Sequence, residues 1–171
     1  MEKKITTHIT SGLLISGVLI ILAVVAYIAS FDQQTWYKWL SGILFIGAVI
    51  YVCINYGKQQ DNNVTFGNTF AYGFKTSAVV TCIMILFLIV FMQVFPEIKE
   101  KAMDEARKQM EKNPAVTESQ IETSLGIMKK GFLVILILGS VFFYLGGGAI
   151  AAVIGAAVTK KNPRSPFDNQ A

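Results

Sequence analysis

The sequence predicts an all-α fold: a polytopic membrane protein with four transmembrane helices and an amphipathic helical hairpin between the third and the fourth. Four apolar runs carry no charged residue near their centres, and they cover residues 9–30, 39–57, 71–95 and 131–158. Each run is close to the roughly 20 residues that a helix needs to cross a bilayer. Charged residues make up 15% of the 171-residue chain, against about 25% in a soluble domain. We therefore expect residues 1–171 to form a single four-helix transmembrane domain.

The first run begins after a short basic leader that contains Lys3 and Lys4. Its apolar stretch is longer than the roughly 7–15 residues of a signal-peptide core. We therefore expect an uncleaved first transmembrane helix, capped by Thr10 or Ser11.

The second run follows a short link rich in aromatic residues, which are Phe31, Trp36, Tyr37 and Trp39. Tryptophan and tyrosine favour the headgroup level of a membrane, so this cluster is interpreted as an interfacial belt. Gly57 suits the end of the second helix.

The third run is preceded by a stretch that mixes phenylalanine with small residues, and Thr65 is the expected cap of a new helix. We expect this stretch to enter the membrane interface at an angle and to continue into the third span. Gly73, Ser77 and Thr81 recur every four residues and form a face through which helix backbones can approach closely. Lys75 lies near the start of this span and is interpreted as reaching back to the headgroups.

Residues 97–130 form the expected helical hairpin outside the membrane. Its first half repeats apolar residues along one stripe, formed by Ile98, Ala102, Met103, Ala106 and Met110. Thr117 and Gln120 match a capping box that opens a second short helix, with Ile121, Leu125 and Met128 facing inward. The hairpin is expected to lie on the membrane or to cap the bundle, and a docking surface for a partner is the alternative.

The fourth run has the most unusual pattern. Gly147, Ala151 and Gly155 recur every four residues, and a second stripe one position on contains Gly148, Ala152 and Ala156. Such stripes predict close helix packing, within the bundle or between copies of the chain. A break at Gly146–Gly148 that exposes carbonyls to a ligand, as in transporters, and a simple kink are the alternatives. The tail, 160–171, is expected to be disordered.

Few residues in this chain can do chemistry. His8 is the only histidine, and Cys53 and Cys82 fall inside predicted spans, where they are interpreted as small apolar residues. The acidic residues cluster in 97–122, where solvated ion pairs account for them. The sequence therefore predicts no catalytic residue, no metal ligand and no cofactor, and the protein is expected not to be an enzyme. The basic residues flank apolar runs, so no nucleic-acid partner is expected.

The order of these features resembles an uncharacterised bacterial membrane-protein family, the domain of unknown function numbered 4199, over nearly the whole chain. The most specific match is the start of the third span, where the motif consists of Phe66, Gly67, Phe70, Gly73 and Phe74. The loop Ala106–Glu122 and the glycine-rich last helix also fit. The resemblance implies an integral protein of the bacterial inner (cytoplasmic) membrane with four transmembrane helices, and it implies no activity, cofactor or catalytic residue.

The expected function is that of a non-enzymatic scaffold or accessory subunit that acts through helix packing. Its expected partners are the lipid bilayer and either a second copy of the chain or another membrane protein. The alternative is a small homo-oligomeric transporter or channel, supported by Gly146–Gly148 and by polar residues in the spans, which are Ser16, Asn55, Ser77 and Thr81. Basic residues before the first helix favour cytoplasmic termini.

Overall fold

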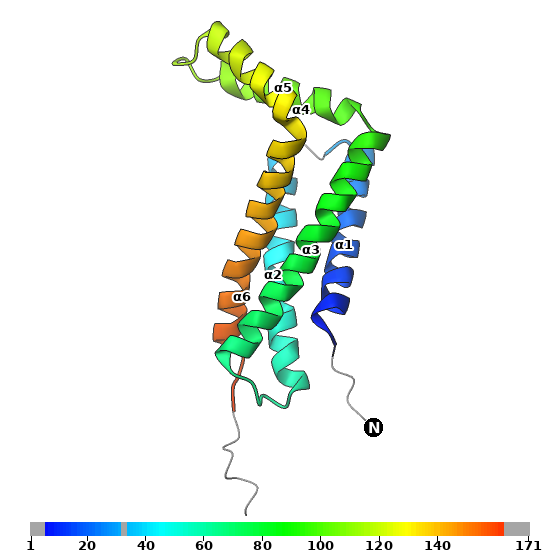
Figure 1. Ribbon diagram of the computed structural model, residues 1–171, viewed down its shortest axis with the longest axis vertical. Helices are drawn as coiled ribbons and strands as arrows, with labels where there is room; N and C mark the ends of the chain where they lie inside the picture. The colour runs from blue at the N-terminus through cyan, green and yellow to red at the C-terminus, as the bar shows by residue number, and fades with distance from the viewer. Residues whose placement is uncertain (1–5, 32–33, 163–171) are drawn as a thin grey trace, which may run out of the picture. The chain divides into compact units, whose positions relative to one another are not determined.

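A computed structural model describes residues 6–31 and 34–162 of the chain, and all regular structure in these residues is helical. The order of elements is α1 (His8–Ile28), α2 (Thr35–Gln59), α3 (Phe66–Val94), α4 (Glu97–Glu111), α5 (Glu118–Ser140), the π-helical segment η1 (Val141–Gly146) and α6 (Gly147–Val158) (Figure 1). The chain divides into two compact units, one formed by 1–84 with 141–171 and the other by 85–140.

Four helical stretches are long and apolar enough to cross a membrane, and they are α1, α2, α3 and the continuous path Glu118–Val158. Their outer surfaces are apolar, as lipid requires, with exposed side chains such as Leu14, Ile43 and Phe142. The predicted all-α fold with four spans is thus confirmed, and the chain is a multi-pass membrane protein.

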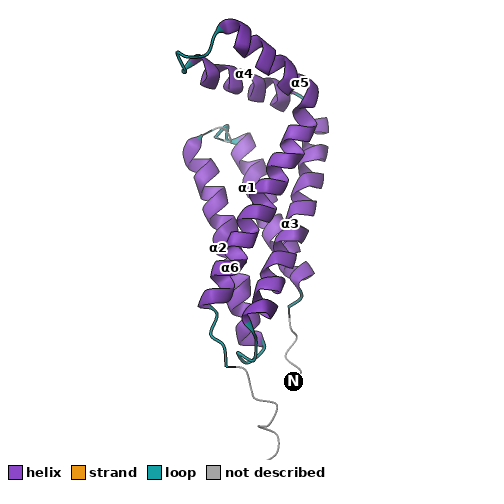
Figure 2. Ribbon diagram, turned by 60° about the vertical axis from the view of Figure 1, so that its left-hand side comes forward, coloured by secondary structure: helices purple, strands orange, loops and turns teal. Residues whose placement is uncertain are grey.

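In the first unit, α6 packs along α2, and α1 packs on the other side of α2. Figure 2 shows these helices running side by side with the first part of α3. The core where they meet contains few large side chains, and its fully buried members include Phe45, Val49, Cys53 and Val80. Small residues fill the remainder, so the helix backbones lie close together.

The start of α1 differs from the expected cap at Thr10 or Ser11. The cap is Thr7, whose side chain accepts a hydrogen bond from the backbone N–H of Thr10. Ser11 is buried instead, and its hydroxyl bonds to the phenol of Tyr72 at 2.8 Å. A tertiary contact therefore uses the side chain that a local pattern had assigned to the helix end.

The last residue of α2 and the α2–α3 link hold the two described ends of the chain. Asp61 and Asn62 adopt left-handed backbone angles, with φ of 52° and 62°, a conformation in which Asn and Asp are several-fold enriched among non-glycine residues. The backbone N–H of Asn162 donates to the carbonyl of Asn62 at 2.7 Å. The side chain of Gln59 bonds to both the backbone N–H and the hydroxyl of Thr6.

Helix α3 begins at Phe66, five residues before the predicted span of 71–95. Thr65 caps it as expected, because its hydroxyl accepts from the N–H of Asn68 at 3.2 Å. The phenylalanine-rich stretch is therefore the first turns of one continuous helix of 29 residues.

The second unit contains α4 and α5, which pack against each other. The predicted capping box is confirmed: Thr117 accepts from the N–H of Gln120, and the side chain of Gln120 accepts from the N–H of Thr117. The predicted apolar stripe of α4 is half-buried along its length, and Ile121 of α5 is buried. We call α4 together with residues 118–130 the hairpin.

The expected separation between a short second hairpin helix and a fourth span is absent from the described residues. Helix runs without interruption from Glu118 to Val158, a length of 41 residues. Nothing in 125–135 stops a helix, since Gly126 and Gly131 each cost only about 1 kcal/mol against alanine. The change in backbone geometry comes later, at η1. Of the predicted disordered tail, residues 163–171 lie outside the described residues.

Candidate functional site

The predicted packing residues of α3 meet the other helices of the first unit at what we call the inner seam, formed by Cys53, Gly73, Ser77, Gly148, Ala152 and Gly155. A Cβ atom added at Gly73 would lie 2.5 Å from the Sγ of Cys53 and 2.9 Å from the Cβ of Ala152. Real Cβ atoms do not approach so closely, so only glycine fits between α2 and α6 here.

The same restriction holds at two glycines of α6. A Cβ at Gly155 would lie 2.8 Å from the Cβ of Cys53 and 3.2 Å from the backbone Cα of Ile50. A Cβ at Gly148 would overlap the side chain of Ser77 and approach the ring of Phe45. Ala151 is fully buried beside them.

The buried hydroxyls near the inner seam are bonded to their own helices. Ser77 donates to the carbonyl of Gly73 at 3.0 Å, Thr81 donates to that of Ser77 at 2.8 Å, and Thr159 donates to that of Gly155. Ser16 does the same in α1. Each hydroxyl proton is thereby used within its helix, which allows these residues to be buried between apolar neighbours.

Gly147, which the sequence pattern assigned to the packing face, lies elsewhere. It is half-buried, and a Cβ atom there would meet nothing within 4 Å. The inward position belongs to Gly148 of the second stripe. The reason is helical periodicity, because the buried residues of α6 follow the spacing of one helix face, and Gly147 falls outside that face: Gly148, Ala151, Ala152, Gly155 and Ala156.

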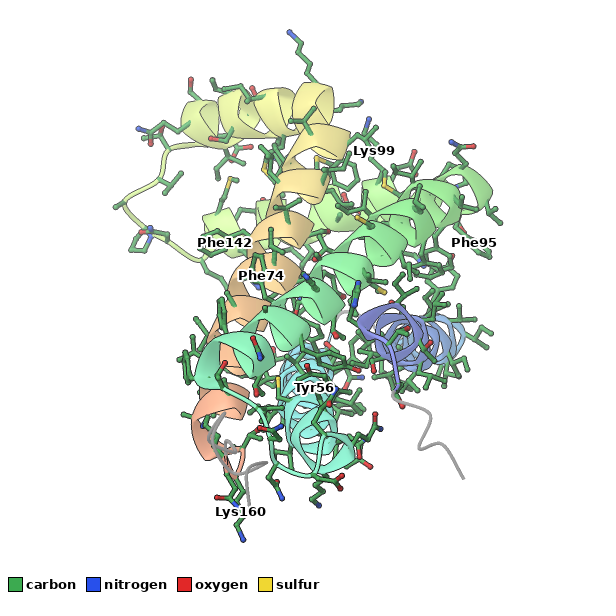
Figure 3. All side chains as sticks on the ribbon, turned by 60° about the horizontal axis from the view of Figure 1, so that its bottom comes forward. Tyr56, Phe74, Phe95, Lys99, Phe142 and Lys160 are labelled. Carbon is green, nitrogen blue, oxygen red and sulfur yellow. The ribbon has the colours of Figure 1, made fainter. Side chains whose placement is uncertain are left out.

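Gly146 and Gly147 instead lie on an outer apolar groove of about 280 Å³, lined by Phe45, Ile46, Phe142, Phe143, Gly146, Gly147 and Ile150. Gly146 is also open, with nothing within 4 Å of a Cβ. Phe142 is 83% exposed and is labelled in Figure 3. On the inner side of the groove, Phe45 is buried and packs edge-on against Tyr144 with ring centroids 5.2 Å apart.

The backbone at Gly146–Gly148 stays helical. Gly146 has φ of −67° and ψ of −53°, and the described glycines include none with positive φ. Helical winding is thus maintained through the triplet, in place of the open break that one alternative required.

The phenylalanine-glycine motif divides into two roles. Phe66, Phe70 and Phe74 stack along α3, with centroid separations of 6.4 Å and 5.8 Å. Gly73 belongs to the inner seam, whereas a Cβ at Gly67 would meet only the hydroxyl of Thr65 at 3.9 Å.

Several close contacts were not anticipated from the sequence. A Cβ at Gly12 would lie 2.6 Å from a methyl of Val79, and one at Gly57 would overlap the methyl of Thr159. The spacing of Gly12 and Ser16 was an available signal, since small residues four apart favour close packing. For Gly57 the expected role as a helix end concealed its packing role.

In the described part of the chain, no three His, Cys, Asp or Glu residues gather as a metal site would require. The chain matches no curated protein and no solved structure. A family model described as "Protein of unknown function (DUF4199)" matches residues 10–161. That range covers all but the first two residues of the four spans, together with the phenylalanine-glycine motif and the hairpin, so the chain belongs to the DUF4199 family.

Proposed function

We propose that this protein is a non-enzymatic scaffold or accessory subunit, and that it binds a transmembrane helix of another membrane protein in the outer groove. The observation that carries this proposal is the pair of open glycines, Gly146 and Gly147, beside exposed aromatic rings. Glycines cost helix stability where no neighbour uses the space above them. A partner helix would use that space.

The surroundings of the groove support a helix as its occupant. The lining residues are all apolar, as a contact within the hydrocarbon region requires. Small residues allow a partner backbone to come close, and Phe142 and Ile150 supply the flanking walls. The adjacent π-helical segment is a feature often found at functional sites.

The transporter alternative has weaker support. The hydroxyls that could line a pore, those of Ser16, Ser77 and Thr81, are buried and donate to carbonyls of their own helices. The winding at Gly146–Gly148 also leaves no unwound carbonyls for an ion.

Site-specific crosslinking tests the proposal. A photoreactive amino acid at Phe142 is expected to give an adduct of defined mass with a second membrane protein, and Gly147→Leu is expected to abolish it. The matched control is the same probe at Ile21, which is 66% exposed on α1. An adduct of twice the chain's mass would instead favour a homo-oligomer, and equal labelling at both positions would contradict a specific groove.

We further propose that the protein lies in the bacterial cytoplasmic membrane with both termini in the cytoplasm. Four basic residues lie near the end of the first unit that contains Thr6 and Asn162, the described ends of the chain: Lys58, Lys75, Lys160 and Lys161. Basic residues favour the cytoplasmic side. A reporter fused to the C-terminus that is active only in the periplasm would overturn this orientation.

A further inference from the structure

The first unit contains a second concave site, whose lining includes polar and basic residues, unlike the apolar lining of the outer groove. We call it the basic cleft. It has a volume of about 450 Å³ and lies between the start of α1 and the start of α3, with Tyr56 of α2 behind it. The polar side chains that line it include His8, Asn68 and Lys75, and the described residues of its lining include no acidic one.

The walls of the basic cleft are held by contacts that do not use these three side chains. Tyr72 donates to the carbonyl of Thr6 and bonds to the hydroxyl of Ser11, both at 2.8 Å, and so fixes α1 against α3. Tyr56 stacks on Tyr72 with centroids 4.3 Å apart and planes 13° from parallel. Figure 3 shows Tyr56 on α2 at this end of the helices. The cleft is therefore formed before any ligand arrives.

The three polar side chains are left without partners among the described residues. No hydrogen bond or ion pair joins the imidazole of His8, the amide of Asn68 or the ammonium of Lys75 to any of them. The nearby Lys161 behaves differently, since its ammonium bonds to the carbonyl of Thr159 at 3.1 Å and lies over the ring of Phe66. Lys75 is thus an exposed charge at the cleft that no described protein group neutralises.

The depth of the basic cleft in the membrane identifies which group can neutralise the charge of Lys75. His8 is the first residue of the 21-residue α1, which is about one hydrocarbon thickness long. Lys75 is likewise about 20 residues before the end of α3 at Val94. Both side chains therefore lie at the boundary of the hydrocarbon, where the phosphates of lipids are found.

We propose that the basic cleft binds the phosphate of an anionic membrane lipid. Lys75 supplies the charge, His8 and Asn68 supply hydrogen-bond donors, and the backbone N–H groups at the start of α1 add a favourable dipole. The apolar Ile9 and Ala71 at the rim are suited to the first carbons of the acyl chains. This site is independent of the partner helix proposed for the outer groove.

Native mass spectrometry of the full chain tests the proposal. The protein is purified in mild detergent and mixed with equal amounts of phosphatidylglycerol and phosphatidylcholine. The wild type is expected to retain phosphatidylglycerol in preference. Lys75→Gln is expected to weaken this binding about fivefold, which is the effect of one basic residue at an anionic surface. Lys75→Arg is expected to preserve it.

The matched control is Lys58→Gln, because Lys58 is an exposed lysine at the same end of the first unit that does not line the cleft. It is expected to bind phosphatidylglycerol as the wild type does. Equal losses in Lys58→Gln and Lys75→Gln, or equal retention of the two lipids, would overturn the proposal. Should Lys75→Gln fail to fold, His8→Gln and Lys75→Arg decide the question by the same comparison.

A second arm distinguishes a lipid from a soluble anion. Inorganic phosphate in millimolar excess is expected not to displace phosphatidylglycerol. Displacement that depends on Lys75 would show that the cleft takes a soluble phosphate, and the lipid assignment would then be wrong.

Discussion

The inner seam and the hairpin are both formed where helices pack together, yet they use opposite kinds of residue. At the inner seam, glycine and alanine bring backbones together, and Ala151, Ala152 and Ala156 are fully buried. In the hairpin, α4 has no buried residue, and its surface carries long charged side chains. The difference follows from the solvent, because lipid gives no hydrophobic drive for helices to associate, whereas water does.

This contrast implies that the inner seam and the hairpin tolerate amino-acid substitutions to different degrees. Contacts at the inner seam are between atoms that cannot move aside, such as the backbone of Ile50 beneath Gly155. Contacts in the hairpin involve flexible side chains around one buried residue, Ile121. A single added side chain should therefore disrupt the seam, while most single changes in the hairpin should be absorbed.

The largest effect is expected for Gly155→Leu. Overpacking a close contact costs about 1–3 kcal/mol and more when backbone must shift, so this variant should lose most of its folded population. The measurement is unfolding of the purified protein in mixed micelles of mild detergent and SDS. Gly147→Leu is the matched control, since its Cβ meets nothing within 4 Å, and it should unfold as the wild type does. Equal loss in both variants would contradict the distinction between the closely packed Gly155 and the open Gly147.

The next effect is expected at the one buried side chain of the hairpin. Ile121→Ala removes apolar contacts between α4 and α5 and should cost about 2–4 kcal/mol locally. Hydrogen exchange should then become faster in α4. Ile127→Ala provides the comparison, because Ile127 is 64% exposed. Unchanged exchange in Ile121→Ala would mean that the charged contacts alone hold the hairpin.

A smaller effect is expected from a polar contact beside the inner seam. Tyr72→Phe keeps the ring that stacks on Tyr56 and removes the bonds to Thr6 and Ser11, at a cost of about 1–2 kcal/mol. The same SDS titration measures it. Tyr51→Phe, at a position 66% exposed, should leave the midpoint in place. A midpoint for Tyr72→Phe equal to that of the wild type would show that these bonds are exchanged for water without loss.

The smallest effect is expected for Arg107→Gln in the hairpin. Arg107 bonds to Glu111 at 2.9 Å and also pairs with Glu118, and all three side chains are solvent-exposed. The hydrogen bond to Glu111, and then the charge of Glu118, raise the pKa of Arg107 further above its ordinary value. A raised pKa in a base stabilises the fold below the ordinary pKa, and the effect is lost only as the pH rises through the folded value. Any difference in hydrogen exchange in α4 between wild type and variant should therefore stay constant from pH 6 to pH 8. It should also be small, because exposed ion pairs contribute little, and a clear loss of protection in the variant would show that the pair matters.

The sequence by itself determined the class of the molecule and the local ends of several helices. Apolar runs of sufficient length have one stable solution in lipid, which is a helix that satisfies its own backbone. The caps at Thr65 and Thr117 were predictable because each bonds within a few residues of itself. The half-buried stripe of α4 followed from its helical period in the same way.

The tertiary structure decided which small residues meet. Both stripes of the last helix have a spacing suited to packing, but Gly148 meets Ser77 of α3 and Phe45 of α2, whereas Gly147 stays open. The tertiary structure also uses the expected cap residue Ser11 elsewhere, since its hydroxyl bonds to Tyr72, 61 residues away, and the cap of α1 is Thr7. The basic cleft could not be predicted from the sequence for the same reason, since His8 and Lys75 come from different helices. Spacing along a chain shows which faces are able to pack, but the partner of each face depends on the angle and register of helices that are distant in sequence.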